Sequence, residues 1–233
     1  MKELISVITP AVRLEELELN RQSLATQDFK DFKWYVCSPF PYQYADVWIK
    51  DPPLNPEDYM GENKAYNQLF KYAQGELVVT LNDSIWLKSN GLSKFWEYYR
   101  TDVRSCFCFM GNHYREVKYG QGIDITYQDV RPLQYQHSVS GSTLVNFDAC
   151  CSSIPMSAVR KIGFIDPVWD QFCCWGIRSF MHDVRQAGYT LNISSESTYL
   201  GQKHTKEYDP NGLWNQKFEE GRVLYEKLYG APL

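Results

Sequence analysis

Short apolar runs alternate along the chain with segments whose apolar residues recur at helical spacing. The runs at 4–9 (LISVIT), 32–38 (FKWYVCS) and 76–81 (ELVVTL) are typical of buried strands. Between them, residues 14–27 and 61–74 have apolar positions three to four residues apart and predict helices. Because helices and strands alternate, the sequence predicts an α/β domain with a mainly parallel sheet.

The second half of the chain is less regular. The pattern predicts helices at 91–100, 155–166, 177–189 and 213–230, and strands at 105–114 and 190–194. Residues 111–146 are polar, rich in Tyr and Gln and turn-prone, so we expect an excursion from the core. Gly75 follows the second predicted helix and fits the left-handed position that ends many helices.

Composition narrows the choice of class and compartment. At 233 residues and 44% hydrophobic content, the chain is long enough for a single domain with a well-filled core. A net charge of -4 gives no general attraction to nucleic acids, and no apolar run approaches the roughly 20 residues that span a membrane. The seven cysteines form no CxxC pair, so we expect reduced thiols in a cytoplasmic protein.

One polar triplet stands out within this pattern. Asn82-Asp83-Ser84 separates the apolar run at 77–81 from the apolar residues 85–87. Either the triplet is a turn, or its carboxylate holds something charged at the end of a buried strand.

Several blocks in the first 90 residues resemble family 2 glycosyltransferases with the GT-A fold. The matching positions are Thr9-Pro10, Ser23, Leu24, Gln27, Phe29-Lys30-Asp31-Phe32, Gly61, Ala65, Asn67, Ala73, Gly75 and Glu76. The segments AVRKIGFID, HDVRQAGY and KHTKEY look like the acceptor-side half of that family. The resemblance implies one Rossmann-like, three-layer GT-A domain over residues 1–233, with residues 1–90 binding the nucleotide sugar and residues 91–233 supplying the acceptor half and a closing helix.

The resemblance also implies an activity and a donor site. Such an enzyme moves a sugar, with inversion, from a nucleotide-diphosphate sugar to an acceptor, most simply a saccharide. In this family an Asp-x-Asp motif holds Mn²⁺ or Mg²⁺ on the diphosphate, where the ion neutralises the leaving group. By position, the donor-binding residues are Thr9, Pro10, Arg13, Ser38, Lys64, Asn67, Asn82, Asp83 and Ser84.

The chain departs from the family pattern at the metal and at the base. The motif reads Asn82-Asp83-Ser84, so at most one carboxylate remains; the resemblance implies weak or absent metal binding, by Asp83 with His204. The family's usual Asp after the second strand, which contacts the nucleotide base, is replaced by Ser38-Pro39. Tyr66 stands where relatives often have Arg.

The catalytic base is the largest departure. An inverting transferase needs a carboxylate to take the proton of the acceptor hydroxyl. The family places it in a Glu-Asp pair after a Trp-Gly, but Trp175-Gly176 is followed here by Ile177-Arg178. The candidates nearby are Asp170, which we favour because it lies in a loop, and Asp183, inside the next helix. We expect Asp166 to be a local cap.

Two alternatives remain open on the sequence. The depleted acidic motif and missing Glu-Asp pair would suit a GT-A-like module that binds a nucleotide or a carbohydrate without catalysis. A transferase acting on a modified nucleic-acid base would also fit, although the acidic net charge disfavours it.

Overall fold

A computed structural model describes residues 3–55, 58, 61–129, 139–140, 147, 149–172, 174–202 and 213–230. Its strands are β1 (Ile5–Pro10), β2 (Phe32–Ser38), β3 (Val47–Lys50), β4 (Leu77–Leu81), β5 (Ile85–Leu87), β6 (Ser105–Lys118), β7 (Gln121–Tyr127), β8 (Val139–Ser140), β9 (Cys151–Pro155) and β10 (Thr190–Gln202). Its helices are α1 (Leu14–Ala25), α2 (Glu62–Tyr72), α3 (Gly91–Thr101), α5 (Met156–Ile162), α6 (Trp175–Gln186), α7 (Trp214–Tyr229) and the 3₁₀ helix η1 (Pro167–Gln171).

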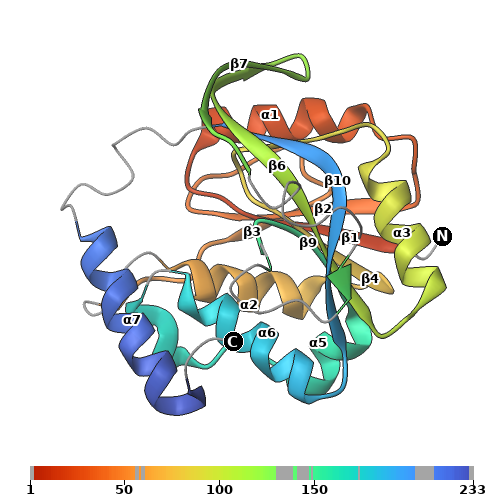
Figure 1. The fold of residues 1–233 in the computed structure, drawn as a ribbon. Helices are drawn as coiled ribbons and strands as arrows, with labels where there is room; N and C mark the ends of the chain where they lie inside the picture. Colours follow the sequence, from red (N-terminus) through yellow and green to blue (C-terminus); the bar gives the residue numbers. More distant parts are fainter. Residues whose placement is uncertain are drawn as a thin grey trace.

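The strands form one sheet in the order β3-β2-β1-β4-β9-β6-β10-β5, with β7 on β6 and β8 on β10 (Figure 1). β1 pairs in parallel with β2 and β4, β2 with β3, and β6 with β10. β9 runs antiparallel between β4 and β6. The α/β class is therefore confirmed, with a mixed sheet whose first half is parallel.

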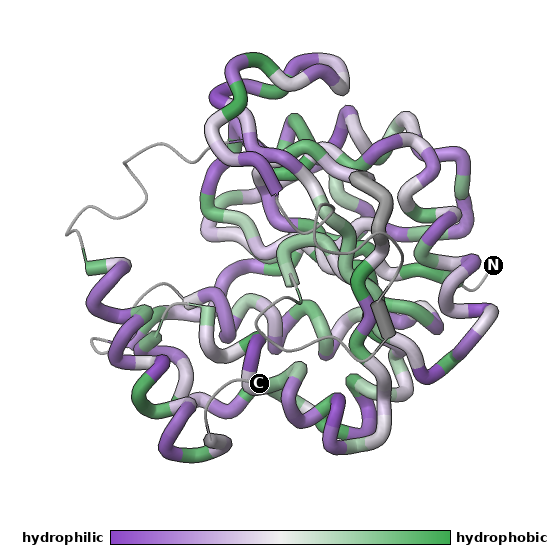
Figure 2. Tube along the Cα trace, viewed as in Figure 1, coloured by the Kyte–Doolittle hydropathy of each residue, from purple (hydrophilic) through white to green (hydrophobic). Residues whose placement is uncertain are grey.

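Helices cover both faces of this sheet, as a three-layer domain requires. Val7 packs in a cluster with residues of α1 and α3, such as Leu17 and Phe95. The next residue, Ile8, belongs to the cluster on the opposite face, which includes residues of α2 and α6. Figure 2 shows the most hydrophobic residues gathered on the central strands. Among the described helices, none is long and apolar enough to cross a membrane.

The excursion predicted for residues 111–146 is confirmed for a projecting hairpin, but strands beyond residue 114 were not predicted, and residues 130–138 and 141–146 lie outside the described part of the chain. β6 continues without a break to Lys118 and turns into β7, and the resulting hairpin projects beyond the sheet at the top of Figure 1. All seven residues of β7 are exposed. Ile123, Ile125 and Tyr127 alternate with polar residues, a strand signal that the sequence analysis did not use.

Gly75 has a different role from the one predicted. Ala73 caps α2 in an extended conformation, and Gly75 has no left-handed backbone. A Cβ on Gly75 would lie 2.7 Å from the backbone nitrogen of Ser6 and 2.9 Å from the carbonyl oxygen of Leu4. Glycine is therefore needed because the chain passes directly against β1.

Gly75→Ala should lower the free energy of unfolding by about 2–3 kcal/mol, because backbone atoms of β1 cannot rotate out of the way. Urea denaturation measures the loss, with Gln74→Ala at the exposed neighbouring position as the control. A change under about 0.5 kcal/mol, the scale of ordinary surface substitutions, would contradict this account.

Candidate functional site

Three strand ends meet at one edge of the sheet. β1 lies between β2 and β4 and runs parallel to both, so Thr9-Pro10, Ser38 and Asn82 lie at the same carboxyl edge. The prediction that these three ends meet is confirmed. In open α/β sheets, ligands bind outside the carboxyl ends of the strands.

The carboxylate of the polar triplet is bound to a cationic side chain. Asp83 is 3% exposed, and its Oδ2 accepts hydrogen bonds from Arg13 Nε at 3.2 Å and from the backbone N–H of Val12 at 3.3 Å. Arg13 Nη2 forms an ion pair with Asp83 Oδ1. Glu16 also contacts the guanidinium, with its Oε2 3.0 Å from Arg13 Nε. Arg13 occupies the position just before α1, at the end of the β1 turn.

The rest of the triplet is held in place by neighbouring elements. Asn82 Oδ1 accepts a hydrogen bond from Tyr66 OH at 3.1 Å, and its amide donates to Cys150 Sγ at 3.2 Å. Asn20 donates to the carbonyl of Asn82 at 3.0 Å, and Ser84 is 3% exposed. Tyr66 therefore orients the first residue of the triplet.

These residues do not fit a divalent ion. Mn²⁺ and Mg²⁺ prefer several oxygen ligands, but both oxygens of Asp83 are engaged by Arg13. No group of three or more His, Cys, Asp or Glu side chains in the described part of the chain could hold a metal. His204, the predicted second ligand, lies outside the described residues, so its pairing with Asp83 stays a prediction.

A carboxylate that the sequence analysis did not predict lies beside Ser38, directly after β3. Asp51 directly follows β3, and its backbone N–H donates to the carbonyl of Ser38 at 3.1 Å. Cys37 Sγ lies 3.0 Å from Asp51 Oδ1, and burial raises the pKa of Asp51. Ser38 itself donates to the carbonyl of Phe40 at 2.6 Å and accepts from Trp48 Nε1 at 3.1 Å. The sequence analysis missed Asp51 because it predicted no strand before it.

Two predicted donor contacts on α2 have internal partners. Lys64 forms an ion pair with Asp58, and 18% of its side chain is exposed. Asn67 donates to the carbonyl of Ile165 at 2.9 Å and accepts from the N–H of the same residue at 2.8 Å. The structure thus gives Asn67 a packing role, and its contact with a donor stays a prediction.

Asp170 is a buried carboxylate in η1. It is 7% exposed, and within the described residues no hydrogen-bond partner reaches its Oδ1. Burial raises the pKa of Asp170, the charge of Asp58 raises it further, and Lys64 opposes the shift. Asp166 accepts a hydrogen bond from the N–H of Val168 at 2.9 Å and caps η1, as expected. A buried oxygen without a partner is uncommon, and a role in binding or catalysis would explain it.

Helix α2 links Asp170 to the strand ends. Asn63, in its first turn, donates to the carbonyl of Trp169 at 2.9 Å and so holds η1 against this helix. Tyr66 lies one turn later on the same face and contacts Asn82. Because α2 leads into the start of β4, its own start lies near the carboxyl edge. Asp170 and the triplet therefore belong to the same side of the molecule.

The Trp175-Gly176 pair has a packing explanation. A Cβ on Gly176 would lie 2.0 Å from Asn63 Oδ1, so only glycine allows α6 to approach α2 this closely. Arg178 Cζ lies 5.2 Å from the centroid of the Trp175 ring.

Asp183, the second predicted base, lies toward the end of α6. Its side chain is 45% exposed, and His182 Nδ1 lies 3.3 Å from its Oδ1. Asp183 also lies near two tyrosines of α7. Burial raises the pKa of Tyr225 and Tyr229, and the negative charge of Asp183 raises both further. No described contact joins Asp183 to the strand ends.

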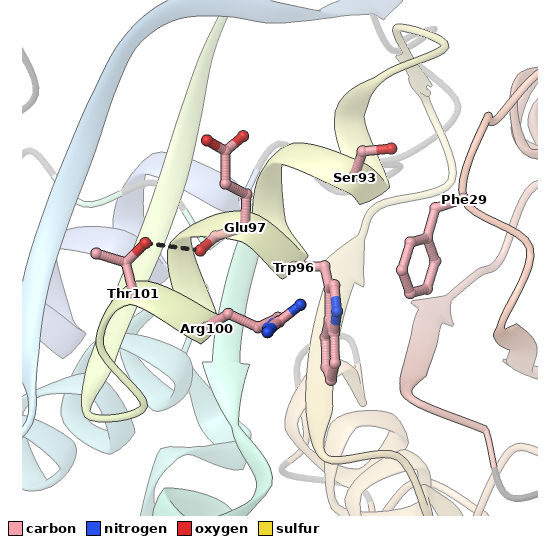
Figure 3. A pocket seen from close by; sticks show the side chains of 6 residues that line it. All are labelled: Phe29, Ser93, Trp96, Glu97, Arg100 and Thr101. Atoms are coloured by element: carbon pink, nitrogen blue, oxygen red, sulfur yellow. Dashed lines mark hydrogen bonds between the residues drawn. The ribbon is translucent and has the colours of Figure 1, made fainter.

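A separate cavity of about 380 Å³ lies beside α3 (Figure 3). It is lined by Phe29, Ser93, Trp96, Glu97, Arg100 and Thr101. Phe29 precedes β2 and Thr101 precedes β6, so this cavity lies at the amino edge of the sheet, opposite the candidate site.

Comparison with known proteins supports the fold. Neither a protein-family model nor a curated protein matches the sequence. The structure of S. aureus TarS 1-349 in complex with UDP-GlcNAc is similar over 99% of this chain and 68% of that chain, with a TM-score of 0.66 and 14% identity. GalNAc-T7 with UDP, GalNAc and Mn²⁺ is similar over 98% of this chain and 48% of that chain, with a TM-score of 0.70 and 9% identity.

The similarity extends over nearly all of this chain but only part of the larger proteins. A longer TarS structure matches with a TM-score of 0.65 at 14% identity, and this chain spans 40% of it. The architecture, the three adjacent strand ends and these matches agree: the chain has the GT-A glycosyltransferase fold.

Proposed function

We propose that this chain is a glycosyltransferase that moves a sugar from a nucleotide-diphosphate sugar to a hydroxyl group of a saccharide acceptor. Because one similar structure holds UDP-GlcNAc and another holds UDP, uridine diphosphate sugars are the first donors to test. The observation that carries the proposal is the buried Asp170 carboxylate, whose Oδ1 has no described partner, on the same side as the three strand ends.

The donor would lie across the carboxyl edge, with residues 1–90 binding it and the later residues supplying the acceptor side. Asp51 would accept a hydrogen bond from the nucleotide base, and Arg13 would lie near the diphosphate. The hydroxyl of Thr9 already accepts from Trp34 Nε1 at 2.9 Å, so Thr9, Pro10 and Ser38 would contact the donor through backbone and shape.

In the reaction, the acceptor oxygen forms a bond to the anomeric carbon while the bond from that carbon to the diphosphate breaks. Asp170 takes the proton of the attacking hydroxyl, and the nucleoside diphosphate leaves with the electron pair. Attack on the face opposite the leaving group inverts the anomeric centre. A raised pKa makes Asp170 a better proton acceptor than an exposed aspartate.

A binding module without catalysis is the second candidate. Arg178 stands where the family has an acidic residue, and Asp83 is engaged by Arg13. Both observations describe a site with fewer available acidic groups than a metal-dependent transferase uses.

A panel of nucleotide sugars separates the two candidates. We expect at least one uridine diphosphate sugar to raise the melting temperature and to release UDP, by hydrolysis or by transfer to added saccharides. Binding without release of UDP from any donor would favour the module, and neither binding nor release would contradict both.

A further inference from the structure

We propose that Arg13 occupies, at Asp83, the place that a divalent cation takes in metal-dependent relatives, so that the donor diphosphate binds without a metal ion. This inference rests on the proposed function, because it concerns the same donor site. It also explains why the residues of the triplet do not fit a metal.

The contacts of Asp83 oppose a metal ion while Arg13 is in place. Arg13 reaches both carboxylate oxygens, through Nε at 3.2 Å and through Nη2, in the two-pronged geometry that favours Arg at such pairs. Mg²⁺ would have to approach an Asp83 oxygen to about 2.0–2.1 Å, and there it would lie against the positive charge of the guanidinium. The Arg13 ion pair therefore opposes a metal at Asp83.

Burial makes that displacement unfavourable. The side chains of Arg13 and Asp83 are 14% and 4% exposed, so separating them would leave a desolvated charge on each side. Ser84 stands at the last acidic position of the motif, so the site lacks a second carboxylate whose binding to a metal would offset this cost. Asn82 cannot replace it readily, because its side chain contacts Tyr66 and Cys150.

Arg13 is also placed to act on a diphosphate. It lies at the carboxyl edge between β1 and α1, where the first turn of α1 adds the positive end of a helix dipole. Glu16 shares the guanidinium and weakens its positive field, so we expect modest affinity.

Removing Arg13 should convert the site into a metal site. Asp83 and Glu16, which are 3% and 6% exposed, would then be two buried carboxylates without their shared cation. Arg13→Gln should therefore gain Mn²⁺ binding, measured by electron paramagnetic resonance of Mn²⁺ alone. The parent protein and the control Arg21→Gln, which alters an exposed pair with Glu18 on the same helix, should show none of this gain.

UDP binding, measured by calorimetry in EDTA and in Mn²⁺, gives the main test. We expect the parent and Arg21→Gln to bind UDP equally in both, within about twofold. Arg13→Gln should bind at least about tenfold more weakly in EDTA and recover in Mn²⁺. Arg13→Lys, which keeps the charge but not the two-pronged geometry, should bind weakly in both.

The outcomes separate this inference from the proposed function. Parent protein that binds UDP only with Mn²⁺ would overturn the inference and leave the glycosyltransferase proposal standing, and this result needs no variant to fold. If the parent binds UDP in neither condition, the uridine donor fails, and the panel of nucleotide sugars decides the proposed function. Mn²⁺ binding equal in the parent and in Arg13→Gln would overturn the inference independently.

Discussion

Asp170→Asn should reduce sugar transfer by about 100-fold or more while UDP affinity stays within about twofold, because the variant keeps the shape of the site and loses the proton acceptor. Initial rates with the best donor measure the first effect and calorimetry the second. Asp183→Asn is the matched control, since Asp183 is the other predicted base and its side chain is 45% exposed. Unchanged transfer in Asp170→Asn, or an equal loss in Asp183→Asn, would remove Asp170 from the mechanism.

Asp170→Asn should lose transfer activity but not stability. Burial raises the pKa of Asp170 in the folded protein, so the folded state binds this proton more tightly than the unfolded state. Its ionised form therefore costs stability, and the cost is full above the folded pKa. As pH falls, this cost shrinks between the folded and the unfolded pKa and is absent below the unfolded pKa. At pH 7 the melting temperature of Asp170→Asn should equal or exceed that of the parent.

Transfer by the parent should rise with pH as Asp170 loses its proton, with the midpoint of the pH–rate profile above the ordinary aspartate pKa.

Gly176→Ala should reduce transfer strongly although the residue touches no substrate. The new Cβ would lie 2.0 Å from Asn63 Oδ1, and Asn63 is 3% exposed and bonded to the carbonyl of Trp169, next to Asp170. Pushing Asn63 aside moves η1, and a displacement of about 1 Å of a catalytic group can cost about 100-fold in rate. We also expect the free energy of unfolding to fall by about 1–3 kcal/mol, as in other overpacked cores.

Asn63→Ala in the same chain makes this prediction specific. The double variant removes the collision, so it should lose less free energy of unfolding than the two single variants lose together. Gln186→Ala, on the exposed face of α6, should change neither stability nor transfer. Additive effects of Gly176 and Asn63 substitutions would show that the two side chains do not meet.

The sequence was sufficient for elements that bury their own apolar pattern. β1, β2 and β4 are continuous buried runs, and α1 and α2 fall close to the predicted ranges. β3 and β5 were missed, because strands of four and three residues carry little pattern and are fixed by pairing with β2 and β10. Such pairings depend on the whole fold.

The candidate site was predicted in position but not in its contacts. Family resemblance placed Thr9, Ser38 and Asn82 at one edge, and parallel pairing confirms it. The Arg13–Asp83 pair joins residues 70 positions apart, and no local pattern signals such a contact. Asp51 was missed together with β3, although its position after the apolar residues 47–49 was a usable signal.

A crystal structure with the best-binding uridine diphosphate sugar tests the central claim most directly. The account predicts the nucleotide across the carboxyl ends of β1, β2 and β4, with the base near Asp51, the diphosphate near Arg13 and the sugar toward Asp170. A nucleotide bound anywhere else, for instance in the α3 cavity around Trp96, would contradict it.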